Sequence, residues 1–153
     1  MAVGDIAELT AFLQAFPQRI AEEALQLRAW VWELYPSANE LIYDNYNALA
    51  IGWGLSDKLG DVFCGIAVYS HINFGFNRGN ELRDERHLLK GDGKQYRYIL
   101  HNNNFPYDYV KQLLQQAHDI ALAGYIVKHG KEPSESGCTI VKSVSEKKRR
   151  PQL

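Results

Sequence analysis

The 153-residue chain is poor in the residues that mark specialised protein classes. It has 2 cysteines, Cys64 and Cys138, which lie too far apart to form a CxxC pair and indicate neither a disulfide scaffold nor a redox motif. No apolar run approaches the ~20 residues that span a bilayer, and residues 1–10 lack the basic start and apolar core of a signal peptide. We therefore expect a cytoplasmic protein with reduced thiols and no membrane partner.

An excess of charge of one sign is also missing, since the formal net charge is −1. Residues 1–130 carry 11 basic and 15 acidic side chains, a net charge of −4, so this part lacks the basic face that nucleic-acid binding needs. Residues 131–153 carry 6 basic and 3 acidic side chains and end in the basic cluster 147–150, which is typical of a solubilising chain end. We expect one domain at 1–130 and a polar, basic, flexible tail at 131–153. The apolar cluster 138–141 leaves open a short pairing of the tail with a sheet edge.

Three segments show the apolar spacing of amphipathic helices. The first covers residues 5–16, the second runs from Pro17 to Tyr35, and the third opens at Pro106 and ends near residues 128–130. On the second helix Trp30 and Trp32 flank the apolar stripe, where their rings cover either a neighbouring element or a homodimer interface.

Between the second and third helices the apolar period changes to two. In residues 48–56 bulky side chains face one way and alanine or glycine the other, a bare side that favours close packing against a helix or, less often, room for a ligand. Further strands are indicated at 62–69, 72–77 and 95–101. Two helices, an antiparallel sheet of about four to five strands and a long C-terminal helix make an α+β fold, which argues against a βαβ nucleotide-binding domain.

Polar and aromatic side chains gather just before the bare-sided strand. Apolar clefts with a few placed polar groups are the usual small-molecule sites, so this segment is the candidate ligand site. The candidate ligand-binding residues are Asp44, Asn45, Tyr46, Asn47, Trp53 and Arg97. The alternative is that Asp44 and Asn45 satisfy backbone groups at a turn and that the rings belong to the core.

Three segments carry a family resemblance by their order and spacing. They are 42–50 (IYDNYNALA), 73–76 (NFGF) and 88–94 (LLKGDGK), and together they resemble the YdhG-like family of domains of unknown function. The resemblance implies a small bacterial cytoplasmic α+β domain without an established general activity, and one branch of the family is described as a frataxin-like intracellular iron chaperone. This chain has Asp84-Glu85 where the family usually has Asp-Pro.

Catalytic and metal motifs are scarce. The histidines show no HxH, HxxxH or HExxH spacing, no G-x-S-x-G elbow occurs, and Gly91–Lys94 departs from a P-loop. Ferrous iron needs only weak carboxylate ligands, for which Glu22, Glu23 and Glu33 are the candidates. The favoured interpretation is a solvated helix face, on which Arg19 pairs with Glu23 at i, i+4. We expect a binding module for a small molecule or a protein partner, with an iron chaperone as the alternative. No catalytic constellation is visible, and the question of an enzyme stays open.

Overall fold

The computed structural model describes residues 7–134 and 136–146. The helices are α1 (Ala7–Leu13), α2 (Gln18–Leu34) and α3 (Tyr107–His129). The strands are β1 (Asn39–Asp44), β2 (Leu49–Gly54), β3 (Val62–Val68), β4 (Ile72–Phe76), β5 (Arg97–Leu100) and β6 (Thr139–Val144), with two short 3-10 turns at Leu59–Asp61 and Gly79–Glu81. The expected start of the first helix at residue 5 and the basic cluster 147–150 lie outside the described residues.

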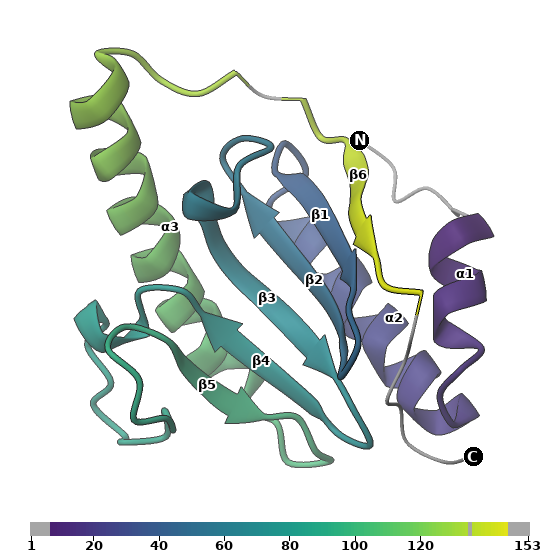
Figure 1. The fold of residues 1–153 in the computed structure, drawn as a ribbon. Coiled ribbons are helices and arrows are strands. Elements are labelled where there is room, and N and C mark those ends of the chain that lie inside the picture. The colour runs from purple at the N-terminus through teal and green to yellow at the C-terminus, as the bar shows by residue number, and fades with distance from the viewer. Residues whose placement is uncertain (1–6, 135, 147–153) are drawn as a thin grey trace.

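The strands form a mixed six-stranded sheet in the order β5-β4-β3-β2-β1-β6 (Figure 1). The pairs from β1 to β5 are antiparallel, as expected. Short connections join the strands from β1 to β4, whereas residues 77–96 join β4 to β5. The expectation of four to five antiparallel strands is wrong at one edge, where β6 pairs in parallel with β1. The apolar cluster 138–141 therefore does reach a sheet edge.

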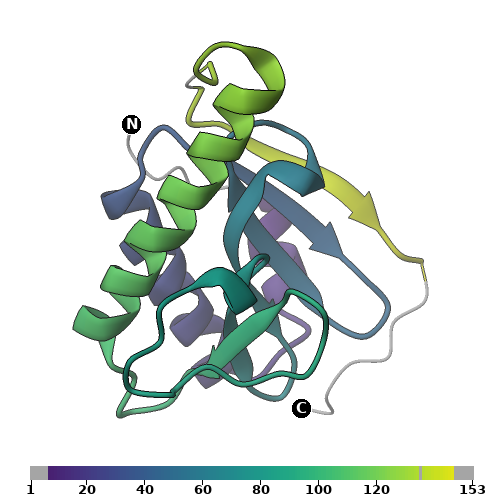
Figure 2. The ribbon, with the colours of Figure 1, turned by 90° about the vertical axis from the view of Figure 1, so that its left-hand side faces the viewer.

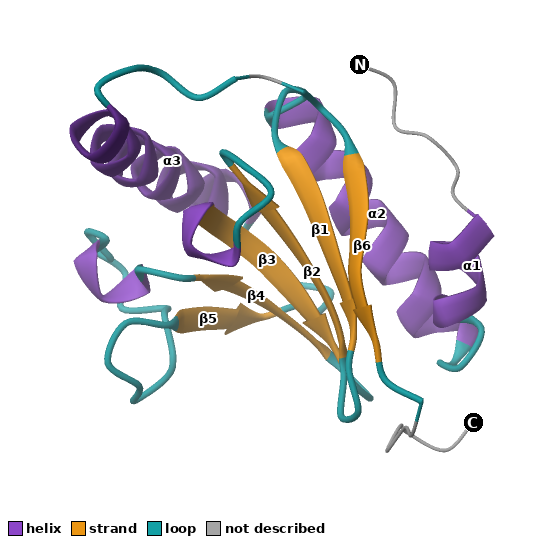
Figure 3. Ribbon diagram, turned by 45° about the horizontal axis from the view of Figure 1, so that its top comes forward, coloured by secondary structure: helices purple, strands orange, loops and turns teal. Residues whose placement is uncertain are grey.

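The helices lie on one face of this sheet. Figure 2 shows the layers from the side, with α2 and α3 to the left of the sheet, and Figure 3 shows α1 beside α2. The expected apolar stripe of α2 is buried, and so are the bulky residues of β2 and the first half of α3. The core side chains include Ile20, Ala24, Leu27, Val31, Leu49, Ile51, Trp53, Val110, Leu113 and Leu114.

The bare side of β2 belongs to the opposite face of the sheet. Gly52, Gly65 and Gly75 are direct partners across β2, β3 and β4, and this face is turned away from α2 and α3 (Figure 1). The expectation that a helix packs here is wrong for the described residues, because the bulky side of β2 takes the helices. At Gly75 the ring of Tyr96, the residue before β5, approaches instead, since a Cβ on Gly75 would collide with it.

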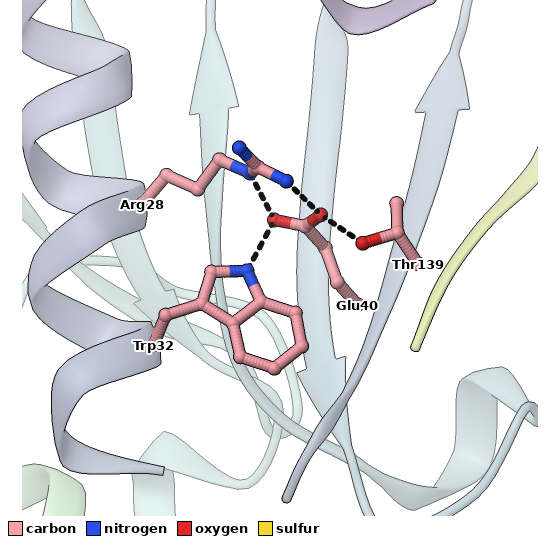
Figure 4. A network of polar contacts seen from close by, with 4 residues as sticks. All are labelled: Arg28, Trp32, Glu40 and Thr139. Carbon is pink, nitrogen blue, oxygen red and sulfur yellow. Dashed lines mark hydrogen bonds and ion pairs between the residues drawn. The ribbon is translucent and has the colours of Figure 1, made fainter. Parts of the chain in front are cut away.

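A buried ionic network joins α2, β1 and β6 (Figure 4). The guanidinium of Arg28 on α2 donates to both carboxylate oxygens of Glu40 on β1, at 2.7 and 2.9 Å. The Trp32 indole N–H and the Thr139 hydroxyl donate to the same carboxylate, at 3.2 and 2.8 Å. Trp30 packs edge-on against Phe74, so Trp30 and Trp32 both contact other residues of their own chain.

The described residues between α3 and β6 lie across one end of the sheet (Figure 3). Helix α3 ends at Gly130, whose φ of 71° is in the left-handed region that glycine adopts without strain. Gly137, with φ 57°, donates its N–H to the Ser37 carbonyl oxygen at 3.1 Å. We call residues 130–134 and 136–137 the strap.

Candidate functional site

A cavity of about 340 Å³ lies under the strap. Its walls come from the C-terminal end of α2, the residues that follow it, the start of the β2–β3 connection, the middle of α3 and the strap. Leu34, Leu55 and Leu122 supply aliphatic wall, while Ser37 and Ser134 supply hydroxyl groups. The site is thus assembled from segments far apart in the sequence.

Three rings in contact form the aromatic wall of the cavity, and we call them the aromatic trio: Tyr35, Phe63 and His118. The Tyr35 and His118 rings are stacked with centroids 4.8 Å apart and an interplanar angle of 28°. Phe63 meets both edge-on, with centroids 5.3 Å from Tyr35 and 5.2 Å from His118. Each neighbour restricts the others, so the rings present a pre-formed wall.

The end of α2 explains the position of Tyr35. Proline disfavours the helical conformation in the residue before it, and Tyr35 precedes Pro36. Tyr35 accordingly caps the helix with φ −133° and ψ 69°, while its N–H still donates to the Val31 carbonyl oxygen at 2.8 Å. This conformation releases the chain from α2 and allows the ring to reach β3 and α3.

The polar groups of the cavity include two titratable members of the trio. Burial, with smaller contributions from Cys64 and Asp119, raises the pKa of Tyr35 to about 12. The Tyr35 hydroxyl therefore stays protonated at physiological pH and acts as a neutral hydrogen-bonding group. Asp119 also lies near His118, with its Oδ1 3.8 Å from the ring Nδ1.

A second cavity of about 200 Å³ adjoins the first through Phe63. It lies over the small residues Ala121 and Gly124 of α3, with Arg78 and Lys128 at its walls. The Arg78 guanidinium donates to both Glu81 carboxylate oxygens, at 2.5 and 3.0 Å, so its charge is already matched within the chain. This arrangement favours the first cavity as the ligand site.

The structure spreads the residues of the candidate ligand site over the sheet. Asp44 is buried at the end of β1, and Asn45, Tyr46 and Asn47 form the exposed β1–β2 turn. The Asn45 N–H closes this turn on the Ala48 carbonyl oxygen at 3.0 Å. The segment thus has the turn geometry that was the alternative interpretation.

The two remaining candidates lie elsewhere. Trp53 is fully buried at the other end of β2, and its indole N–H has no hydrogen-bond partner within the described residues. Arg97 is on β5, which three strands separate from β1, and donates to the carbonyl oxygens of Gly93 and Tyr96, each at 2.7 Å. Neither residue shares a site with the β1–β2 turn, nor do they line either cavity.

The candidate iron ligands lie on α2, where two of them interact with neighbouring side chains and the third lies apart from both. Glu22 accepts a hydrogen bond from Gln18 at 2.9 Å, and Glu23 pairs with Arg19 at 3.4 Å. Glu33 is exposed about three turns further along the helix. Within the described residues no group of three or more His, Cys, Asp or Glu side chains could hold a metal ion. These glutamates therefore do not form such a group.

Comparisons of the chain with family models, curated proteins and solved structures found no match. No helix in the part of the chain that the structure describes is long and apolar enough to cross a membrane. The function is therefore argued from the cavity itself.

The site residues predicted from the sequence include no member of the aromatic trio. The one local signal was Tyr35 before Pro36, which predicts a helix end but not what the ring contacts. His118 follows the buried Ala117 on α3, and Phe63 opens an apolar strand, so each is ordinary in its own segment.

Proposed function

We propose that the protein is a small-molecule-binding module and that the cavity under the strap is its binding site. The observation that carries the proposal is a cavity of about 340 Å³ with a wall of three contacting rings. Small-molecule sites are typically concave, mostly apolar and about 300–1,000 Å³, with a few polar groups that orient the ligand. The Tyr35 and serine hydroxyl groups serve as those polar groups.

This role requires no chemical step. With its pKa raised to about 12, Tyr35 is a poor general base at neutral pH, whereas a protonated hydroxyl is well suited to hold a ligand by hydrogen bonding. We keep the YdhG-like resemblance as part of the proposal, because it too implies a small α+β domain without an established activity. The two free cysteines, Cys64 and Cys138, support the proposed cytoplasmic location.

Native mass spectrometry and an NMR screen of a fragment library test the proposal together. Protein purified gently from a bacterial lysate is weighed under native and denaturing conditions, and the ligand-free protein is then screened by its ¹⁵N–¹H spectrum. We expect shifts confined to the trio, the strap and the start of β3. Stable binding of a ligand also raises the melting temperature, by an amount that grows with the logarithm of the ligand concentration once this exceeds the dissociation constant.

A pair of tryptophan variants shows whether the ligands occupy this cavity. Ser134→Trp places a large ring into the cavity from the exposed strap, and we expect it to abolish binding. Ser70→Trp puts the same ring on the exposed β3–β4 turn, at the end of β3 away from Phe63, and we expect it to bind like the parent. A screen without shifts in the cavity, or ligands that bind Ser134→Trp as well as Ser70→Trp, would show the proposed site to be wrong.

A further inference from the structure

In the part of the chain that the structure describes, the lining of the cavity under the strap contains an acidic side chain but no lysine or arginine. Glu132 is the one Asp, Glu, Lys or Arg side chain among the described residues that line it. Asp119 does not line the cavity, but its Oδ1 lies 3.8 Å from Nδ1 of the His118 ring, which does. A ligand in this cavity therefore meets the carboxylate of the exposed Glu132 without a lysine or arginine in the described lining to offset it.

The aromatic trio also attracts cations. The face of an aromatic ring carries the negative part of its quadrupole, which attracts a cation within about 6 Å of the ring centroid. Tyr35 and Phe63 are of this kind whatever the protonation state of His118, and one face of Tyr35 is stacked on the His118 ring, which leaves its other face for a ligand. The protonated Tyr35 hydroxyl adds an acceptor oxygen but no negative charge.

The aliphatic side chains determine the rest of the ligand. Leu34, Leu55 and Leu122 line the cavity, so an apolar body is needed to fill the volume that the polar groups leave. An anionic group would face Glu132 without a cationic partner in the wall, and burial of such a group is costly. A neutral ligand gains nothing from the charge of the cavity.

Resting on the proposed function, we propose that the ligand of this cavity is a small organic cation, a protonated amine or quaternary ammonium group joined to a compact apolar body. The ammonium group lies between Glu132 and the ring faces, and the apolar body lies against the leucines. The Ser37 and Ser134 side chains provide hydrogen-bonding groups near the strap.

A matched series of three probes tests the charge of the ligand. 3,3-Dimethylbutylamine, 3,3-dimethylbutan-1-ol and 3,3-dimethylbutanoate share one apolar body and differ in the charge at the same end. Dissociation constants are measured by ¹⁵N–¹H titration at pH 7.5 in low salt. We expect the amine to bind roughly three- to tenfold more tightly than the alcohol, and the carboxylate more weakly than both. The preference for the amine falls as salt is added.

Substitutions assign this preference to named groups. Glu132→Gln is expected to reduce the preference of amine over alcohol, whereas Glu85→Gln, an exposed residue outside this cavity, leaves it unchanged. Tyr35→Phe keeps the ring and is expected to keep the preference, while Tyr35→Leu removes the ring face and reduces it. Tyr35 is half-buried, and the melting temperature of each variant confirms that it folds.

The outcomes separate this inference from the proposed function. Equal dissociation constants for amine and alcohol, or tightest binding of the carboxylate, overturn the cationic class while leaving the cavity as a binding site. Absence of amine binding, when fragments of another class shift the same resonances, overturns the inference as well. Absence of any cavity ligand in the fragment screen overturns the proposed function itself.

Discussion

At the scale of single residues, Arg28 and Glu40 form an ion pair inside the fold. Both side chains are buried, and the carboxylate faces donors from α2 and β6. Breaking a buried pair by removing one charge is strongly destabilising, because the other charge stays in a low-dielectric environment. We predict that Glu40→Gln lowers the free energy of unfolding by about 3–5 kcal/mol in urea denaturation.

The Arg19–Glu23 pair is the natural control for that measurement. It also joins an arginine to a glutamate, but it is an i,i+4 pair at 3.4 Å in which Arg19 is largely exposed. Pairs of this kind contribute about 0.3–0.5 kcal/mol, so Glu23→Gln is expected to change the unfolding free energy little. Similar losses for the two variants would mean that burial does not govern the Arg28–Glu40 pair.

The Asp84 carboxyl makes the stability of the fold depend on pH. Burial acts to raise the pKa of its carboxyl, but hydrogen bonds from the Tyr109 hydroxyl at 2.5 Å and from the N–H groups of Leu89 and Leu88 at 2.8 and 3.1 Å lower it overall. A carboxyl with a depressed folded-state pKa stabilises the fold above its unfolded pKa of about 3.9, and that contribution is lost as the pH falls below it. We predict that Asp84→Asn destabilises the protein at pH 7 and that the difference from the parent narrows as the pH falls below about 4. Denaturation at several pH values measures this, and a difference that does not narrow would contradict it.

At the scale of elements, regular spacing made most helices and strands predictable from the sequence. The stripe of α2 and the alternation of β2 are local patterns, and both are buried as expected. Strand β1 was missed because it buries Asn39, Glu40 and Asp44, which read as loop residues. Glu40 is compatible with a core strand only because Arg28 and Thr139 reach it from distant parts of the chain.

The candidate site was less predictable than the elements for a related reason. The DNYN segment is rich in hydrogen-bonding side chains, but in the structure it forms the β1–β2 turn. The cavity depends instead on the meeting of Tyr35, Phe63 and His118 from three elements. Local periodicity indicates which side of an element is buried, but it does not indicate which distant side chain that surface meets.

The junction of α3 and the strap depends on the backbone of one glycine. A Cβ on Gly130 would meet no atom within 4 Å, so its φ of 71° is the one obstacle to substitution. A Cβ on Gly60 would also meet no atom within 4 Å, but the φ of Gly60 lies outside the positive range. We predict that Gly130→Ala lowers the free energy of unfolding by about 1 kcal/mol, whereas Gly60→Ala is neutral or stabilising by up to about 1 kcal/mol.

Thermal denaturation of both variants measures this contrast, and hydrogen exchange locates its effect. Exchange is expected to increase at the last turn of α3 and in the strap of Gly130→Ala, and to stay unchanged in the core strands. Equal stability of the two alanine variants would show that the left-handed conformation at residue 130 costs nothing to a side chain.

At the scale of the whole molecule, the segment after α3 serves the sheet and the cavity together. Through Glu132–Ser134 it closes the cavity, and through β6 it covers the β1 edge. Lys142 adds a further link, since its ammonium group donates to the Asp57 carbonyl oxygen at 2.8 Å. Removal of this segment should therefore affect stability, association and binding at the same time.

A truncation after Gly130 tests this dependence, with a truncation after Glu146 as the control that keeps every described residue of the segment. Without β6, the β1 edge exposes backbone N–H and C=O groups beside the apolar Leu41 and Ile42, and an edge of this kind pairs with other chains. The Glu40 carboxylate also loses the Thr139 hydroxyl, a hydrogen bond to a charged group that contributes about 1.5–3 kcal/mol. We predict that the shorter chain has a lower free energy of unfolding and associates with rising concentration in sedimentation velocity, while the control chain stays like the parent. Adding a synthetic peptide of residues 131–146 should reverse the association, because the peptide occupies the same edge. Concentration-independent sedimentation of the chain that ends at Gly130 would mean that β6 is not what protects the β1 edge.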